Sequence, residues 1–197
     1  MRKVWPLTFS CMRTSAEKPR LFCVPLMNFK DDLERRAREY AQRHGLALGE
    51  QLGAGVHGIV FVTESQPEKG AAAACSAIKV HRQVPDYCRE REVYLRLKEI
   101  GLVEIRGCHV PELVRFDDEL WIIEMTVVTR PFVLDFAGAF LDQRPDFSEE
   151  VLTDWRGEKQ EQFGPRWPEV EGILRFLEVH GIYMVDVSLN NISLPAK

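Results

Sequence analysis

The sequence predicts an α+β fold in which an antiparallel five-stranded sheet with one helix is followed by a smaller helical part. Over residues 29–128, short apolar runs and amphipathic segments alternate in the order expected for such a sheet. Over 129–197 the strand-like runs give way to charged sequence and one amphipathic segment. Residues 1–28 show no clean periodicity and predict an irregular N-terminal extension. The 197 residues, 45% of them hydrophobic, are enough for a sizeable core.

The elements of the first part follow from local periodicity. Apolar residues recur at helical spacing over 31–44, and Gly45 follows as a stop signal. A second helical pattern occupies 87–100. Alternating or continuous short apolar runs, bounded by turn residues, predict five strands, over 47–52, 58–62, 76–80, 113–116 and 120–125.

The second part begins with an apolar tract over 132–137, which either lines the floor of a cleft or packs in the core. Residues 142–168 are charged and interrupted by prolines, which predicts short helices and loops. A helical period predicts a helix over 169–180. Aromatic residues of this part either form a partner-binding patch or pin the segment to the core, namely Trp155, Phe163 and Trp167.

Composition excludes several classes of protein. The formal net charge of -4 and the lack of a long Lys/Arg block argue against a nucleic-acid partner. No apolar run approaches the roughly 20 residues that a membrane helix needs. The five cysteines are odd in number and form no Cys-x-x-Cys pair, which favours reduced thiols. We therefore expect a cytoplasmic protein that binds neither nucleic acid nor membrane.

A glycine-rich segment is the first candidate for a functional motif. Gly53, Gly55, Gly58 and Val60 form a Gly-x-Gly-x-x-Gly-x-Val pattern between two predicted strands. Glycines let a backbone approach phosphate groups closely, although the same pattern occurs in ordinary hairpins. A dinucleotide site is disfavoured because the last glycine enters a strand and does not open a helix. The segment predicts a phosphate-covering turn or a plain hairpin.

The next predicted strand contributes a lysine. In Ala77-Ile78-Lys79 the ammonium can reach the α and β phosphates of a nucleotide beneath the glycines. The alternative is a lysine that faces solvent. The following helix supplies an acidic partner for the lysine, with Glu92 preferred and Glu90 second. Either glutamate can also belong to a solvated charged face.

The C-terminal segment contains an Asp followed five positions later by an Asn, Asp186 and Asn191. In this pattern the carboxylate can orient a substrate hydroxyl while the amide oxygen binds a metal ion that bridges phosphates. The alternative is a loop that uses these residues for turns.

In this order the motifs resemble those of the protein-kinase-like superfamily, from the helix before Leu52 to Lys197. The resemblance implies an N-lobe over 29–128, with the helix over 87–100 as its αC helix, and an abbreviated helical C-lobe. It implies catalytic roles for Asp186 as base and for Lys79 with Glu92. Residues implied in nucleotide binding are Gly53, Gly55, Gly58, Val60, Ala77, Lys79 and the backbone of Glu124 and Thr126, with Asn191 as a metal ligand.

The resemblance also implies an activity. An ATP-binding protein of this family, with Mg²⁺, transfers a phosphoryl group to a protein hydroxyl, so that a nucleotide and a protein substrate are its partners. Met184-Val185 replace the family's His-Arg before the Asp, and Ser188 stands where a lysine is common. No Asp-Phe-Gly follows Asn191, so Asp135 or Asp154 would have to supply the metal ligand. The alternative is an inactive pseudokinase-like interaction module.

Overall fold

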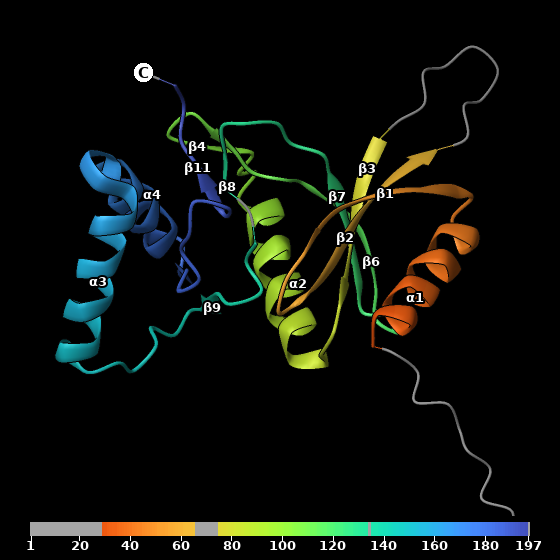
Figure 1. The fold of residues 1–197 in the computed structure, drawn as a ribbon, viewed down its shortest axis with the longest axis horizontal. Helices are drawn as coiled ribbons and strands as arrows, with labels where there is room; N and C mark the ends of the chain where they lie inside the picture. Colours follow the sequence, from red (N-terminus) through yellow and green to blue (C-terminus); the bar gives the residue numbers. More distant parts are fainter. Residues whose placement is uncertain (1–28, 66–74, 134, 197) are drawn as a thin grey trace, which may run out of the picture.

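The computed structural model describes residues 29–65, 75–133 and 135–196 (Figure 1). The predicted N-terminal extension over 1–28 lies outside these residues. The described chain has a mixed α+β fold, with a five-stranded antiparallel sheet at one end and two adjacent helices at the other.

The five strands are the predicted ones; four of them are longer than predicted by one to three residues, and the last starts two residues later and ends one residue later. Their order in the sheet is β1-β2-β3-β7-β6, and every neighbouring pair is antiparallel. The bounds are β1 (Leu46–Ala54), β2 (Gly58–Ser65), β3 (Cys75–His81), β6 (Leu113–Asp117) and β7 (Ile122–Thr126). The predicted five-stranded antiparallel sheet is therefore confirmed.

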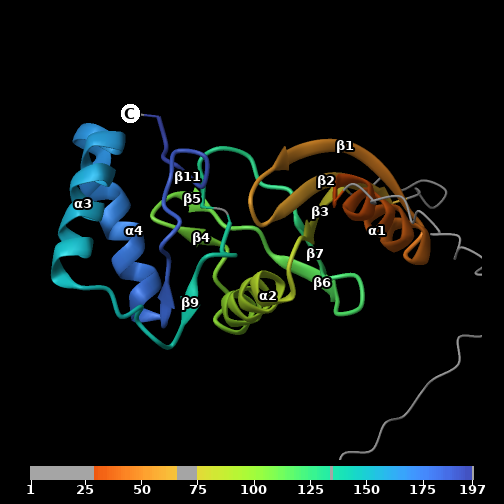
Figure 2. The same cartoon turned by 60° about the horizontal axis from the view of Figure 1, so that its bottom comes forward.

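Two helices, α1 (Phe29–Arg43) and α2 (Val84–Glu99), cover opposite faces of this sheet (Figure 2). Leu33 and Tyr40 of α1 pack against Ile78 and Val80 of β3. Ala77, one position along the strand, packs on the α2 side. Since successive side chains of a strand point to opposite faces, Lys79 is directed toward α2 as well. The alternation of β3 thus decides which helix the lysine meets.

Six two-residue strands were not predicted. Four form a second sheet in the order β11-β8-β5-β4, and two pair with each other. Runs this short carry no periodicity, so local sequence cannot reveal them. Their bounds are β4 (Glu104–Ile105), β5 (Cys108–His109), β8 (Phe132–Val133), β9 (Phe140–Leu141), β10 (Ile182–Tyr183) and β11 (Ile192–Ser193).

The segment predicted as short helices and loops contains one long helix, α3 (Glu149–Phe163), followed by the short η1 (Gly164–Arg166). The Ser148 hydroxyl caps α3 by accepting a hydrogen bond from the Val151 amide at 3.3 Å. Of the residues of α3, only Phe163 is buried, so the helix has no apolar stripe from which it could be predicted. That part of the prediction is wrong.

The predicted last helix is confirmed as α4 (Trp167–Val179), whose buried face includes Val170, Ile173 and Leu177. These residues join one hydrophobic cluster with Tyr94 of α2 and Ile123 of β7. The sheet and the α3–α4 end therefore share a core. No helix among the described residues is long and apolar enough to cross a membrane.

Candidate functional site

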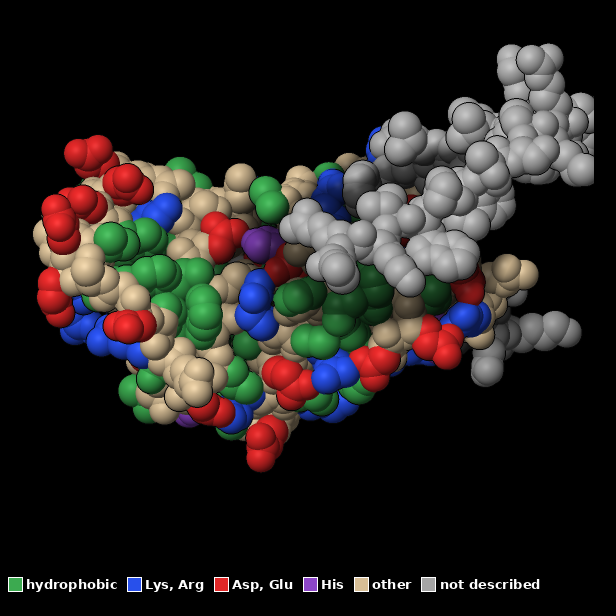
Figure 3. All heavy atoms as spheres, turned by 90° about the horizontal axis from the view of Figure 1, so that it is seen from below, with side chains coloured by type: hydrophobic (Ala, Val, Ile, Leu, Met, Phe, Trp, Pro, Cys, Tyr) green, Lys and Arg blue, Asp and Glu red, His purple; other side chains and the backbone are tan. Residues whose placement is uncertain are grey.

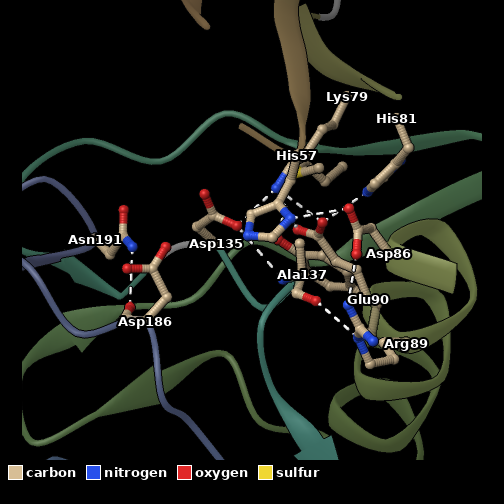
Figure 4. A network of polar contacts seen from close by, with 12 residues as sticks. His57, Lys79, His81, Asp86, Arg89, Glu90, Asp135, Ala137, Asp186 and Asn191 are labelled. Carbon is tan, nitrogen blue, oxygen red and sulfur yellow. Dashed lines mark hydrogen bonds and ion pairs between the residues drawn. The ribbon is translucent and has the colours of Figure 1, made fainter. Parts of the chain in front are cut away.

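Lys79 is buried and held by two carboxylates. Its side chain is 7% exposed, and its Nζ lies 2.8 Å from Glu90 Oε2 and 2.7 Å from Asp135 Oδ1 (Figure 4). Burial alone lowers the pKa of Lys79, but the two carboxylates outweigh that effect and raise it. The lysine is therefore a charged group inside the protein, and the solvent-facing alternative is wrong.

The partner on α2 is Glu90, not the preferred Glu92. Glu90 is 1% exposed, whereas the Glu92 side chain is 47% exposed and pairs with Arg91. The inward face of α2 carries Tyr87, Glu90 and Tyr94, at spacings of three and four residues. Side chains two positions apart on a helix point about 200° away from each other around its axis, so Glu92 is directed to solvent. The prediction that Glu92 holds the lysine is corrected to Glu90.

Glu90 is ionised in this setting. Burial alone raises the pKa of its carboxyl, but the Lys79 charge and a hydrogen bond from His81 lower it to about 2. His81 Nε2 lies 2.7 Å from Glu90 Oε2. The carboxylate therefore has two cationic or donor neighbours, which compensate for its removal from water.

Asp135 reaches the same place from the β8–β11 ladder. Val133 and Ile192 are partners in this antiparallel pair. A residue just after β8 and a residue just before β11 therefore lie at the same end of the ladder. Asp135 lies two residues after β8 and Asn191 one residue before β11, so the pairing of strands distant in the sequence places both residues at the same end of the ladder.

The Asp135 segment is anchored by its neighbours in the chain. The ring of Phe136 is buried and stands edge-on to Tyr94 of α2, with 5.7 Å between the ring centroids. The Ala137 amide donates to Asp135 Oδ1 at 3.4 Å. Of the two outcomes considered for the apolar tract over 132–137, packing in the core holds for Val133, Phe136 and Ala137. Asp135 is the polar exception.

Asp186 and Asn191 belong to one closed loop. Asn191 Nδ2 donates to the Asp186 carbonyl oxygen at 3.0 Å, and the Asn191 and Ile192 amides donate to the Ser188 carbonyl. Asn191 is buried while Asp186 is exposed. A Cβ atom on Gly138 would lie 3.3 Å from Asp186 Cβ, so the Asp135 segment packs against this loop. Figure 4 shows Asp135 between Lys79 and the Asp186–Asn191 pair.

Two oxygens of this group have no hydrogen bond to the described residues, Asp135 Oδ2 and Asn191 Oδ1. Carboxylate and amide oxygens are ligands that Mg²⁺ accepts. No group of three or more His, Cys, Asp or Glu side chains that could hold a metal ion occurs in the part of the chain that the structure describes. A magnesium ion here would therefore take its remaining ligands from water and phosphate oxygens, as is usual for this ion.

The glycine segment is a tight turn between β1 and β2. The Gly55 amide donates to the Gly58 carbonyl at 2.9 Å. A Cβ on Gly58 would lie 2.2 Å from the Val80 carbonyl oxygen, so packing on β3 demands glycine there. A Cβ on Gly53 or Gly55 would meet nothing within 4 Å. Those two positions leave the turn's backbone open to approach, while Val60 continues into β2 opposite Lys79.

A chain of polar contacts ties the glycine turn to the rest of the site (Figure 4). His57 Nδ1, from the turn, lies 3.0 Å from Asp86 Oδ2 at the start of α2. Arg89 donates to Asp86 and, through Nε, to the Ala137 carbonyl at 3.1 Å. The first turns of α2 therefore connect the glycine turn with the segment that carries Asp135. Sequence reasoning missed this connection.

The predicted adenine contacts need a correction. Glu124 lies within β7, opposite Ile78 on one side and Arg115 on the other. The Thr126 amide donates to the Glu112 carbonyl at 3.0 Å. The ladder thus engages the backbone of Glu124 and the amide of Thr126, which were expected to be free for a base.

A cavity of about 310 Å³ lies at the other end of the described chain, between α3 and α4. Hydrophobic side chains gather over this end in Figure 3. Trp155 and Trp167 stand edge-to-face in its wall, with Phe163 and Trp167 buried, so these aromatic residues pin α3 to the core. Met184 and Val185, which precede Asp186, also line the cavity.

No protein-family model and no curated protein sequence matches the chain. The functional argument therefore depends on the residues and their geometry.

Proposed function

We propose that the protein is a protein-kinase-like phosphotransferase that binds ATP with Mg²⁺ and transfers the γ-phosphoryl group to a protein hydroxyl. One observation carries the proposal. Lys79, a buried ammonium behind a glycine turn, is paired with an α2 carboxylate and with Asp135, beside the Asp186–Asn191 loop. This set matches the parts by which kinases hold phosphates, metal and the attacking hydroxyl.

The Asp-Phe pair of residues 135 and 136 supports an active enzyme over a pseudokinase. In the family, a metal-binding Asp-Phe-Gly follows the catalytic loop in the sequence. Here an Asp-Phe-Ala precedes that loop, at the end of β8. Because antiparallel strands meet at one end whichever comes first in the chain, the upstream Asp135 can occupy the place of the downstream Asp.

The residues divide the chemistry among them. Lys79 neutralises phosphate charge, and Glu90 keeps its ammonium oriented. Asp135 Oδ2 and Asn191 Oδ1 are the oxygens that would hold Mg²⁺, which neutralises charge on the phosphate oxygens when bound. Asp186 is exposed and accepts the proton of the substrate hydroxyl as its oxygen bonds to the γ phosphorus and the bond to ADP breaks.

The departures from the family pattern predict a slow enzyme. Ser188 replaces a lysine that contacts phosphate, and removal of one preorganised charge-stabilising group costs roughly a hundredfold to a thousandfold in rate. Met184 is buried and lines the α3–α4 cavity, so it does not take over the role of the family's histidine. These features favour, as second candidate, a pseudokinase-like module that binds nucleotide without transfer.

The test combines binding and transfer. Three proteins are compared: the wild type, Asp186→Asn and the control Asp154→Asn, whose residue lies on the exposed α3. Thermal unfolding of each is measured with ATP, with and without Mg²⁺. Each is also assayed for transfer of the γ-phosphate to a generic protein acceptor and to the chain itself. We expect all three to be stabilised by ATP with Mg²⁺ and only Asp186→Asn to lose transfer. Stabilisation without transfer in the wild type would favour the pseudokinase, and no stabilisation would refute both.

A further inference from the structure

The glycine turn between β1 and β2 has little packing of its own. A Cβ on Gly53 or Gly55 would meet nothing within 4 Å, and Val56 is 85% exposed. A hydrogen bond from the Gly55 amide to the Gly58 carbonyl closes the turn internally. Because glycines restrict the backbone little, the position of the turn over the site depends on contacts with other elements.

The chain after β3 supplies such contacts. The Arg82 amide donates to the His57 carbonyl at 2.9 Å, and Arg82 Nε donates to the Gly55 carbonyl at 3.2 Å. His57 directs its ring to α2, where Nδ1 lies 3.0 Å from Asp86 Oδ2 (Figure 4). This contact needs no charge on the ring, because a neutral imidazole with its hydrogen on Nδ1 can donate to the carboxylate.

Asp86 uses both of its carboxylate oxygens. Oδ2 faces His57, and Oδ1 accepts a hydrogen bond from Arg89 Nη2. Arg89 Nε in turn donates to the Ala137 carbonyl at 3.1 Å. Ala137 lies two residues after Asp135, and its amide donates to Asp135 Oδ1 at 3.4 Å. One carboxylate therefore joins the glycine turn with the segment that carries the proposed metal ligand.

The sequence of α2 places this carboxylate on the inner side of the helix. Asp86 and Glu90 are four positions apart, so both belong to the buried face of α2. The Asp86 side chain is only 12% exposed. Hydrogen bonds in such a setting are stronger than in water, because the local dielectric constant is low.

We propose that Asp86 is a positioning residue of the phosphate site, which holds the glycine turn and the Asp135 segment in a fixed mutual position through His57 and Arg89. The inference rests on the function proposed above, because these two segments are the ones that would contact the phosphates and Mg²⁺. Asp86 acts through its two neighbours and is not itself a catalytic residue.

Removal of this carboxylate has a consequence at each of its two ends. The glycine turn keeps its contacts with Arg82 but loses the one with α2. Arg89 loses the acceptor that orients it toward the Ala137 carbonyl. A hydrogen bond to a charged group contributes roughly tenfold to a hundredfold to an equilibrium constant. We therefore expect a more mobile turn and weaker binding of ATP with Mg²⁺.

The first test needs no nucleotide. NMR order parameters of the backbone amides are compared in the full chain as wild type, as Asp86→Ala and as the control Glu99→Ala, whose side chain on the same helix is 78% exposed. In Asp86→Ala we expect the order parameter of Gly55 to fall below about 0.6, while that of Ile78 in the central β3 stays near about 0.85. A merely structural role would not loosen the turn selectively in the folded state.

Two outcomes of this measurement would overturn the proposal. One is an unchanged order parameter of Gly55 in Asp86→Ala. The other is a turn that is already mobile in the wild type, with a value below about 0.6. Both outcomes are independent of whether the protein binds ATP.

The second test measures the affinity for ATP with Mg²⁺ in Asp86→Ala, in Arg89→Met and in the double variant. We expect Asp86→Ala to bind about tenfold more weakly than the wild type and the Glu99→Ala control. The double variant should bind no more weakly than Asp86→Ala, because Arg89 acts through the same carboxylate. Wild-type affinity in Asp86→Ala, or losses that simply add, would overturn the positioning role. Absence of ATP binding in every protein would instead refute the proposed function, while the order parameters still decide whether Asp86 holds the turn.

Discussion

The Lys79–Glu90 pair offers the sharpest test of the site, through the matched substitutions Glu90→Gln and Glu92→Gln. Glu90 is buried between Lys79 and His81, so its neutralisation removes one of the two carboxylate charges that compensate the buried Lys79 ammonium. Glu92 differs from it by two positions on the same helix and is exposed. The sequence alone ranked these two residues in the opposite order.

The magnitude can be worked out in two ways. Removal of one partner from a buried ion pair costs about 3–5 kcal/mol. A second estimate comes from the pKa of Glu90. Burial raises this pKa, but Lys79 and the hydrogen bond from His81 outweigh burial and bring it from the ordinary 4.5 down to about 2. That difference corresponds to about 3 kcal/mol of folding free energy. For a chain of this size we expect Glu90→Gln to lower Tm by about 6–20 °C, and Glu92→Gln to cost less than about 0.5 kcal/mol.

The same pKa fixes the sign of the acid response. A carboxyl whose pKa is lowered by folding contributes its stabilisation in full above its unfolded value of 4.5 and loses it as pH falls toward about 2. The assay is urea unfolding of the wild type and both variants at neutral pH and at about pH 3. The gap between wild type and Glu90→Gln should shrink in acid. Equal stability of the two variants at neutral pH would refute the placement of Glu90.

Two further substitutions probe the turn and the metal ligands. Gly58→Ala places a methyl group 2.2 Å from the Val80 carbonyl oxygen and should lower the free energy of unfolding by about 1–3 kcal/mol. In the control Gly55→Ala the methyl group meets open space. Equal stability of the two variants in thermal denaturation would contradict the packing argument. Asp135→Asn should leave the fold intact but remove the Mg²⁺-dependent part of the stabilisation by ATP in a thermal-shift assay. The control Asp154→Asn should keep the full stabilisation. If Asp135→Asn also keeps the Mg²⁺-dependent part, Asp135 is excluded as a metal ligand.

Much of the fold could be predicted because its main elements are periodic. The five strands of the sheet and the helices α1, α2 and α4 each carry an apolar pattern along their own length. Helix α3 was missed because most of its residues face solvent and only Phe163 is buried, so its apolar pattern is weak; the Ser148 cap marks its start. The two-residue strands were missed because their pairing partners are distant in the sequence.

The residues of the candidate site likewise divide into those that local sequence predicted and those that it could not. Lys79 and the glycines could be predicted because strand alternation and the turn are local features of the sequence. Asp186 and Asn191 could be predicted because they lie only five positions apart. Asp135 was named only as one of two possible ligands. Nothing within its own segment indicates that β8 pairs with β11 and so places Asp135 at the end of the ladder where Asn191 lies.

By itself the sequence determined which segments form the five strands, the glycine turn, the lysine of β3 and the Asp–Asn loop, since each follows from residues a few positions apart. Tertiary structure alone decided which carboxylates meet the lysine. The rotation of α2 about its axis selects Glu90 over Glu92, and the β8–β11 pairing brings in Asp135. Both depend on packing between segments far apart in the chain, where a buried ammonium requires compensating charge at contact distance.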